Sequence, residues 1–261
     1  METLTIVLAG AFGLLFGSFA NVVIHRIPDG HSIVKPPSAC PTCGHRIAAR
    51  DNVPVLSWVL LRGRCRHCAE PISARYPLVE LAMGVVFAVV AWRIGPDPAL
   101  PAFLLFAWLL VVVAVIDART QRIPNRLTYT LTPALVVLLV AAALLSGDPV
   151  VALRVLLGGL AAFAAMLALA LIAPRGMGMG DVKLSAFIGA GLGYLGWGHV
   201  LLGMMAAYLL GGLTAIALIV LGIRGRKEKM PFGPYLAVGA LVSLLVGTEL
   251  VQAYLRSSGL A

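Results

Sequence analysis

The chain has 261 residues, of which 60% are hydrophobic and only 12% are charged. This composition is too apolar for an ordinary soluble domain and indicates a membrane protein. Apolar runs of roughly 17 to 25 residues, the length that crosses a bilayer as a helix, recur from one end of the chain to the other. Because these runs are continuously apolar and lack the alternation of membrane strands, we expect helices rather than a barrel.

The first apolar run, 4–24, is expected to remain in the protein as a transmembrane helix. No basic residue precedes it, whereas His25 and Arg26 follow it directly. A cleaved secretory signal has the opposite order of charges. We therefore interpret run 4–24 as a retained helix that enters the membrane from outside.

Seven further runs complete the expected set of membrane helices. Their predicted ranges are 76–94, 101–117, 127–146, 151–173, 182–196, 199–222 and 233–255. Run 182–196 is short and interrupted by glycines, which predicts a tilted or partly unwound helix packed inside the bundle. The fold class is therefore an all-α polytopic membrane protein with about eight transmembrane helices and no visible internal repeat.

Basic residues fall almost entirely in the connections on one side of this predicted bundle. Of the 20 Lys and Arg residues, only Arg93, Arg154 and Arg256 fall on the other side. The positive-inside rule places the basic side in the cytoplasm, so both termini are expected outside, in a periplasmic or extracellular compartment. Topology thus explains most of the net charge of +9, which is no evidence for binding nucleic acid.

Segment 25–75 is the only candidate for an extramembrane domain, and it contains every cysteine of the chain. The four are Cys40, Cys43, Cys65 and Cys68. They form two C-x2-C pairs with 21 residues between them, close to the spacing of a four-thiolate zinc site. A segment this short needs help to hold a stable core, and metal binding supplies folding free energy. We predict a small cytoplasmic zinc-ribbon-like segment with a structural Zn2+.

Two disulfides are the alternative use of these cysteines, and a reducing cytoplasm disfavours them. Because four sulfurs already fill a zinc site, His45 and His67 are expected to be solvated or to lie behind the ligands. Tethering to a membrane bundle also argues against a nucleic-acid-binding role for this segment.

Four acids lie in or at the edge of apolar runs: Glu80, Asp117, Asp181 and Glu249. An acid at the centre of a membrane helix costs about 2.5 to 3.5 kcal/mol on insertion scales, so each is a functional candidate. Glu249 is expected to be interfacial or to serve packing. Glu80 is expected to pair with Arg75 or with another base of segment 25–75.

Asp117 and Asp181 both fall at the cytoplasmic boundary, so their side chains can meet. Two carboxylates in close contact share a proton, and one then acts as a base on water while the other polarises a carbonyl group. This is the chemistry of an aspartic protease. Asp117 ends its helix and Asp181 begins another, so the helix dipoles favour a charged Asp181 and a protonated Asp117 by about 0.3 to 1 kcal/mol each.

The glycines that precede Asp181, namely Gly176, Gly178 and Gly180, allow otherwise forbidden backbone angles and close approach of a substrate strand. Taken alone, this run could be a turn with an N-cap, and Asp117 could be a helix cap or a topological marker. A phosphate loop is disfavoured, since the run follows no strand and lacks G-K-[ST]. Lys183 either tunes Asp181, holds a lipid phosphate, or is a snorkelling anchor at the bilayer surface.

The motifs of the chain, taken together, resemble the type IV prepilin peptidase family of GxGD intramembrane aspartic proteases. In chain order they are "FGSFANVVIHRIP", the paired C-x2-C segment, "PISARYPLVEL", "IDARTQRIPNRLT", "GMGMGDVKL" and "FGPYLAVG". The resemblance implies that Asp117 and Asp181 are the catalytic pair and that Gly178 and Gly180 form the G-x-G signature. It also implies a bacterial inner-membrane protein whose 76–261 region cleaves the leader peptide of prepilins or pseudopilins on the cytoplasmic side.

The same resemblance implies a second activity, methylation of the new N-terminal amine with S-adenosylmethionine. It is associated with a region that matches 40–84 here, where no Gly-rich cofactor loop is visible. The cofactor site is therefore unassigned, and Glu80 and Gly84 are its only candidates. Alternatives are a proton-coupled transporter, which should carry midplane carboxylates and repeat symmetry, and a zinc-ribbon scaffold without activity. The sequence assigns no oligomeric state.

Overall fold

The computed structural model describes residues 1–173, 177–223, 225, 228 and 230–258. Gly176 lies outside these described residues. So do five of the bases used for the topology: Arg175, Arg224, Arg226, Lys227 and Lys229. Within the described ranges the chain is helical and forms no β-strand, which confirms the predicted fold class. It divides into two compact units, Met1–Pro96 and Asp97–Ala261, which we call the N-terminal and C-terminal units.

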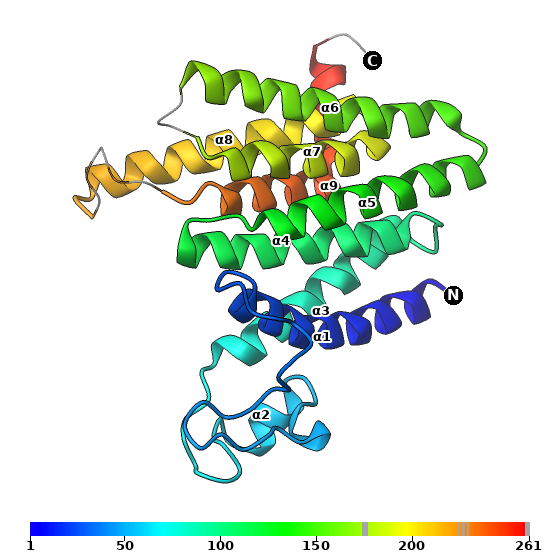
Figure 1. Ribbon diagram of the computed structural model, residues 1–261. Helices are drawn as coiled ribbons and strands as arrows, with labels where there is room; N and C mark the ends of the chain where they lie inside the picture. The colour runs from blue at the N-terminus through cyan, green and yellow to red at the C-terminus, as the bar shows by residue number, and fades with distance from the viewer. Residues whose placement is uncertain (174–176, 224, 226–227, 229, 259–261) are drawn as a thin grey trace. The chain divides into compact units, whose positions relative to one another are not determined.

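The N-terminal unit contains two long helices with the cysteine segment between them in sequence. Helices α1 (Glu2–Arg26) and α3 (Arg75–Ile94) pack side by side (Figure 1). Glycines of α1 make this approach possible, since a Cβ atom on Gly17 would lie 2.6 Å from the Cα atom of Glu80. The cysteine segment adds a 3-10 helix, η1 (Ala49–Asp51), and the short helix α2 (Leu56–Leu60). Neither of these two was predicted.

The C-terminal unit is a bundle of six helices. They are α4 (Leu100–Thr120), α5 (Asn125–Leu145), α6 (Pro149–Ile172), α7 (Met179–Leu195), α8 (Trp197–Val220) and α9 (Gly233–Ser257). Helix α7 lies at the centre and contacts each of the other five. Its Phe187 ring stacks on Phe106 of α4, with 5.3 Å between the ring centroids. The middle of α7 is thereby packed into the core of the bundle.

Helix α7 is continuous, so the predicted partial unwinding is wrong, although its place inside the bundle is confirmed. Its glycines serve close packing against α6: a Cβ atom on Gly158 would lie 2.6 Å from the carbonyl oxygen of Gly189. Arg154 of α6 caps the other end of α7 by donating to the carbonyl oxygens of Gly193 at 2.7 Å and Tyr194 at 2.8 Å. An arginine near a helix C-terminus satisfies carbonyl groups that have no partner inside the helix.

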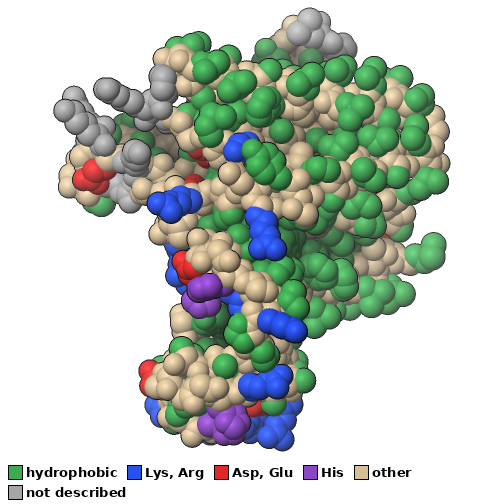
Figure 2. Space-filling model, in the orientation of Figure 1, with side chains coloured by type: hydrophobic (Ala, Val, Ile, Leu, Met, Phe, Trp, Pro, Cys, Tyr) green, Lys and Arg blue, Asp and Glu red, His purple; other side chains and the backbone are tan. Residues whose placement is uncertain are grey.

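Seven helices of the described residues are long and apolar enough to cross a membrane: α1, α3, α4, α5, α6, α8 and α9. The predicted eighth, α7, has 17 residues and is largely enclosed by its neighbours. Hydrophobic side chains are spread over the helical surface seen in Figure 2. Many leucines of the helices, such as Leu153 and Leu213, are exposed. Such a surface requires lipid around it. The chain is a multi-pass membrane protein.

Candidate active site and metal centre

Asp117 lies in the last turn of α4 and is held by the beginning of α9. Its carboxylate is only 4% exposed, and its Oδ2 atom accepts a hydrogen bond from the backbone N–H of Gly233 at 2.8 Å. The first N–H groups of a helix have no partner within the helix and favour an anion. A Cβ atom on residue 233 would lie 2.8 Å from the same Oδ2 atom. Only glycine therefore allows this contact.

Gly233 was not identified by the sequence reasoning, which recognised its motif "FGPYLAVG" but assigned no role to it. The available signal was a glycine followed by proline at the start of a helix, where proline is well tolerated. Because the donor is a backbone group, the residue type by itself does not identify its acceptor.

Asp181 is the third residue of α7 and is also buried, with 9% exposure. Its Oδ2 atom accepts a hydrogen bond from the backbone N–H of Gly178 at 3.2 Å. A carboxylate at this position commonly reaches back to the residue that precedes the helix. The capping role considered for Asp181 thus coexists with a place in a buried polar pair.

The expected unusual backbone angles are found at neither glycine of the G-x-G signature, so this prediction is wrong for both. Gly178 has an extended backbone with φ −83° and ψ 145°, and Gly180 lies within α7. Gly180 instead permits close packing, since a Cβ atom there would lie 2.9 Å from the Cβ atom of Ile123. The glycine brings the first turn of α7 against the segment that follows α4.

The structure brings Asp117 and Asp181 close enough for a direct electrostatic interaction. One carboxylate comes from the C-terminal end of α4 and the other from the N-terminal end of α7. Both are buried, and a backbone N–H group donates to one oxygen of each. This arrangement can share one proton between two acids in a medium of low polarity.

Lys183, two residues after Asp181 on α7, is engaged by α5. Its Nζ atom donates to Oδ1 of Asn125 at 2.8 Å and lies 4.9 Å from the centroid of the Tyr129 ring. Both partners are neutral, and both belong to the first two turns of α5. The ammonium group therefore connects the beginnings of α5 and α7. Its roles as a tuner of Asp181, a ligand of lipid phosphate or a snorkelling anchor stay predictions.

The four cysteines of the N-terminal unit form one cluster. Their sulfur atoms all lie within 4.8 Å of one another, and those of Cys40 and Cys68 are 3.8 Å apart. None of the four is in a disulfide, so the alternative pairing is not formed. Tetrahedral coordination with metal–sulfur bonds of about 2.3 Å places the sulfurs about 3.8 Å apart. The cluster can hold a metal ion, with four protein ligands and no open position.

The two C-x2-C turns repeat one backbone pattern. The N–H groups of Cys40 and Gly44 donate to the carbonyl oxygens of His45 and Cys40, respectively. Cys65 and Ala69 make the same two bonds, to Glu70 and Cys65. This short structural repeat was missed in the sequence, because a C-x2-C pair contributes only two matching letters to each copy.

Backbone N–H groups favour the thiolate form of one cysteine in each turn, whereas desolvation and the neighbouring cysteine side chains raise the pKa of the Cys68 thiol to about 12. The N–H groups of Cys43 and Thr42 lower the pKa of the Cys40 thiol to about 6, and those of Cys68 and His67 lower the pKa of Cys65. The thiolate is the form that binds a metal ion. The rings of His45 and His67 stack on each other with their centroids 3.5 Å apart, outside the four-sulfur group.

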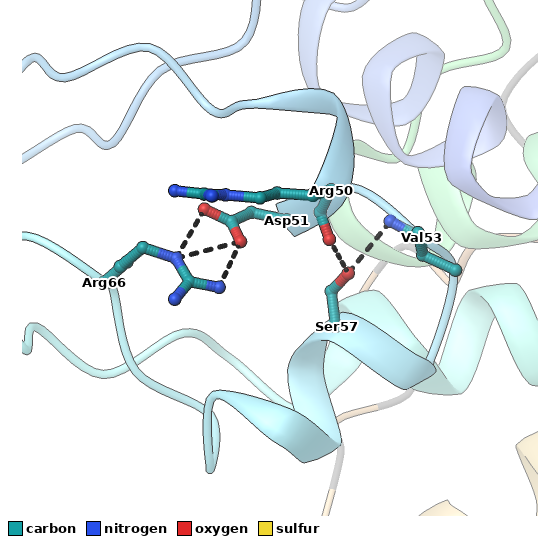
Figure 3. A network of polar contacts seen from close by, with 5 residues as sticks. All are labelled: Arg50, Asp51, Val53, Ser57 and Arg66. Carbon is teal, nitrogen blue, oxygen red and sulfur yellow. Dashed lines mark hydrogen bonds and ion pairs between the residues drawn. The ribbon is translucent and has the colours of Figure 1, made fainter.

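Polar contacts connect the second C-x2-C turn to η1, and η1 to α2 (Figure 3). Arg66 donates to both carboxylate oxygens of Asp51, at 2.6 to 3.0 Å. The Ser57 hydroxyl donates to the carbonyl oxygen of Arg50 at 3.0 Å and accepts from the N–H of Val53 at 2.9 Å. The beginning of α2 is therefore fixed against η1.

Glu80 of α3 completes this connection within the N-terminal unit. Its Oε2 atom accepts from the backbone N–H of Val55 at 2.7 Å, and Ser18 of α1 also makes a hydrogen bond to it. The expected pairing of Glu80 with Arg75 is wrong, because backbone and hydroxyl donors take the place of a base. Val55 is β-branched and has φ +62°, a conformation that costs energy and persists only when its surroundings impose it. Glu80 supplies that constraint.

Gly84, the other candidate for the cofactor site, faces α1. A Cβ atom on it would lie 2.8 Å from Cδ2 of Leu14, so helix packing accounts for the glycine.

Two buried side-chain polar atoms among the described residues have no hydrogen-bond partner, Oδ1 of Asn21 and Nε of Arg75. Both belong to the N-terminal unit, and Nδ2 of Asn21 donates to the carbonyl oxygen of Tyr76, the residue after Arg75. They are an acceptor and a donor available to a bound polar group.

Comparison with known proteins gives consistent matches along the chain. The Bacterial Peptidase A24 N-terminal domain family matches residues 11–94, and the Type IV leader peptidase family matches residues 104–216. A protein from Aeromonas hydrophila named "Prepilin leader peptidase/N-methyltransferase" is 37% identical over 94% of this chain and 92% of its own length. No solved structure matches the chain.

Two further relatives carry the same name. The one from Pseudomonas aeruginosa is 33% identical over 95% of this chain and 92% of its own length. The one from Burkholderia pseudomallei is 36% identical over 90% of this chain and 84% of its own length. Since these matches cover nearly all of both partners, the chain belongs to the type IV leader peptidase family.

Proposed function

We propose that this protein is a membrane aspartic endopeptidase that removes the leader peptide of type IV prepilins or pseudopilins and then methylates the new N-terminal residue. The names of its relatives support both activities. The observation that carries the peptidase activity is that Asp117 and Asp181 are both buried at helix ends and are close enough to interact electrostatically. The basic connections of the sequence favour cleavage at the cytoplasmic face of the bacterial inner membrane.

In the proposed cleavage the two carboxylates act as an acid–base pair. One takes a proton from water as the water oxygen adds to the carbonyl carbon, and the other gives its proton to the carbonyl oxygen. The carbon–nitrogen bond then breaks, and the leaving amine takes a proton from the pair. Gly233 and Gly178 hold the Oδ2 atoms, and we propose that the Oδ1 atoms face water and substrate. That Asp181 carries the resting charge stays a prediction.

A proton-coupled transporter is less well supported by the same residues. Asp117 and Asp181 each lie within about one turn of a helix end, whereas a transported ion needs carboxylates near the middle of the membrane. The comparisons also give peptidase relatives along nearly the whole chain.

For the metal we propose a structural Zn2+ held by Cys40, Cys43, Cys65 and Cys68. The sulfur spacing and the lowered pKa values of the Cys40 and Cys65 thiols support this choice, since zinc prefers four tetrahedral thiolates. Four protein ligands leave no position for water, so the metal stabilises the segment and takes no part in a reaction.

For methyl transfer we propose that the N-terminal unit holds the cofactor. S-adenosylmethionine, when bound, supplies the methyl group that the new amine receives. Glu80 and the unpartnered Asn21 Oδ1 and Arg75 Nε are the buried polar groups that support a site there. They can accept from and donate to an amine, hydroxyl or carboxylate of a ligand. Gly84 contributes by letting α1 and α3 approach, which positions Asn21 beside Tyr76.

The test of the peptidase is cleavage of a prepilin-like peptide by the purified protein in lipid nanodiscs. Asp117→Ala and Asp181→Ala are each expected to lower the rate by more than about 10³-fold, since acid–base partners act as a unit. Glu249→Gln is the matched control, because it also alters an acid of a membrane helix, and it is expected to cleave at the wild-type rate. Full cleavage by either Asp variant, or none by the wild type, would contradict the proposal.

A further inference from the structure

Tyr208, on α8, lies near the proposed active site. Its ring packs on Phe232 with 5.2 Å between the centroids. Phe232 immediately precedes Gly233, whose N–H group holds Asp117. Tyr208 is also close enough to Asp181 for an electrostatic interaction. The Tyr208 ring thus packs on the residue before Gly233, which holds Asp117, and the same side chain lies close to Asp181.

The Tyr208 hydroxyl has a weak partner in the bundle. It donates to the thioether sulfur of Met166 at 2.7 Å, and a thioether is a poor acceptor compared with a peptide oxygen. The side chain is 37% exposed, whereas Asp117 and Asp181 are 4% and 9% exposed. Tyr208 is therefore the most exposed of these three residues.

A donor at this place adds to the proton that the carboxylate pair gives to the carbonyl oxygen. When water adds to a peptide carbonyl, negative charge develops on the carbonyl oxygen, and a fixed donor in a water-poor site stabilises that charge. Gly233 and Gly178 cannot supply this donor, because their N–H groups already bind Asp117 and Asp181. The Tyr208 hydroxyl can exchange its sulfur acceptor for the carbonyl oxygen with little loss.

We propose that Tyr208 is a third catalytic residue, whose hydroxyl donates a hydrogen bond to the carbonyl oxygen of the scissile peptide bond. The hydroxyl keeps its proton throughout, since the carboxylate pair carries out the proton transfers. The packing of its ring on Phe232 sets the direction of the hydroxyl. This inference rests on the proposed peptidase function and adds a substrate contact to the same site.

The test compares two tyrosines of α8 and α9 that both pack on Phe232. Tyr208→Phe removes only the hydroxyl oxygen and is expected to lower kcat by about 10²-fold, with little change in KM. Tyr235→Phe removes the same atom from a ring whose centroid lies 6.4 Å from that of Phe232. The Tyr235 hydroxyl donates to the Met230 sulfur at 3.8 Å. This control is expected to keep the wild-type kcat.

Thermal unfolding of both variants accompanies the kinetics, and kcat is compared at a temperature well below each Tm. If Tyr208→Phe has the wild-type kcat while the wild type cleaves and Asp181→Ala does not, the inference is overturned and the peptidase function stands. An equal fall in kcat for Tyr235→Phe would also overturn it, since the loss of either hydroxyl would then have the same effect. A wild type that leaves the peptide uncut contradicts the proposed function itself.

Discussion

The two units of the molecule hold their buried acids in different ways. In the C-terminal unit, Asp117 and Asp181 are fixed by backbone N–H groups at helix beginnings. In the N-terminal unit, Glu80 receives the N–H group of Val55 from a segment without regular core helices. The first arrangement is rigid because helices define it, whereas the second depends on whatever folds the cysteine segment. We therefore expect mutations to separate cleavage from methylation.

Gly233→Ala is expected to separate cleavage from methylation most strongly. The new Cβ atom would lie 2.8 Å from Oδ2 of Asp117 and 3.1 Å from its Cβ atom, so the carboxylate has to turn away. Because a displacement of about 1 Å can cost about 10²-fold in rate, cleavage should fall by about that factor. Methylation of a pre-cleaved peptide should continue, which mass spectrometry of the product measures.

Gly212→Ala is the matched control for this variant. Residue 212 is also glycine in the C-terminal unit, but no atom lies within 4 Å of a Cβ atom placed on it. Its cleavage rate should equal that of the wild type. Equal rates for both alanine variants would show that Asp117 does not need its backbone donor.

Removing the metal is expected to separate the two activities in the opposite direction. A chelator, or Cys65→Ser, should unfold the cysteine segment, because metal binding supplies folding free energy that the segment lacks. Methylation should then fall by at least about ten-fold, while peptide cleavage by the C-terminal unit should persist. Metal analysis of the untreated protein should give one zinc ion per chain, with four sulfur neighbours in its X-ray absorption spectrum.

Restoration by added Zn2+ is the control for chelation, and the Cys65→Ser variant should not recover. A protein that loses cleavage and methylation in parallel would contradict the separation of the two units. A metal-free protein with unchanged hydrogen exchange across residues 36–72 would contradict the structural role of the metal.

A smaller effect is expected from Glu80→Gln. The amide retains an oxygen for Val55 but loses the charge, and a hydrogen bond to a charged group contributes about 1.5 to 3 kcal/mol. Amide hydrogen exchange around residues 53–60 should accelerate by about ten-fold, with the metal still bound. Glu70→Gln is the control, because Glu70 is an exposed acid of the same segment. Equal exchange in the two variants would mean that Glu80 does not fasten the segment to α3.

Much of the fold could be predicted from the sequence, for physical reasons that individual residues show. Apolar runs have to match the thickness of the bilayer, so the eight long helices begin and end within a few residues of their predicted positions. Acids are costly in such runs, so Asp117 and Asp181 were conspicuous. Metal geometry restricts the spacing of its ligands, and the four cysteine sulfurs do converge.

What the sequence could not predict depends on backbone groups and on close packing. The donors to Asp117 and Glu80 are N–H groups of Gly233 and Val55, and any residue except proline has such a group. Glycines permit both unwinding and close helix contact, and α7 uses Gly189 for the second purpose. Tyr208 is surrounded in sequence by apolar residues, so only the fold reveals what its hydroxyl faces.

The smallest effect is expected at the ion pair between Asp51 and Arg66. The hydrogen bonds from Arg66 lower the pKa of the Asp51 carboxyl below its ordinary value of 3.8. Since the folded pKa lies below the unfolded one, the stabilisation is fully present above the unfolded value and is lost as pH falls through the lowered pKa. In the metal-loaded protein, Asp51→Asn should therefore accelerate exchange around residues 49–58 by at most a few-fold at pH 7, because an ion pair with an exposed arginine contributes little. High salt should reduce this difference, and the difference should be the same at pH 6 and pH 8. A larger acceleration than that of Glu80→Gln would place the main attachment of the segment at Asp51 instead of at Val55.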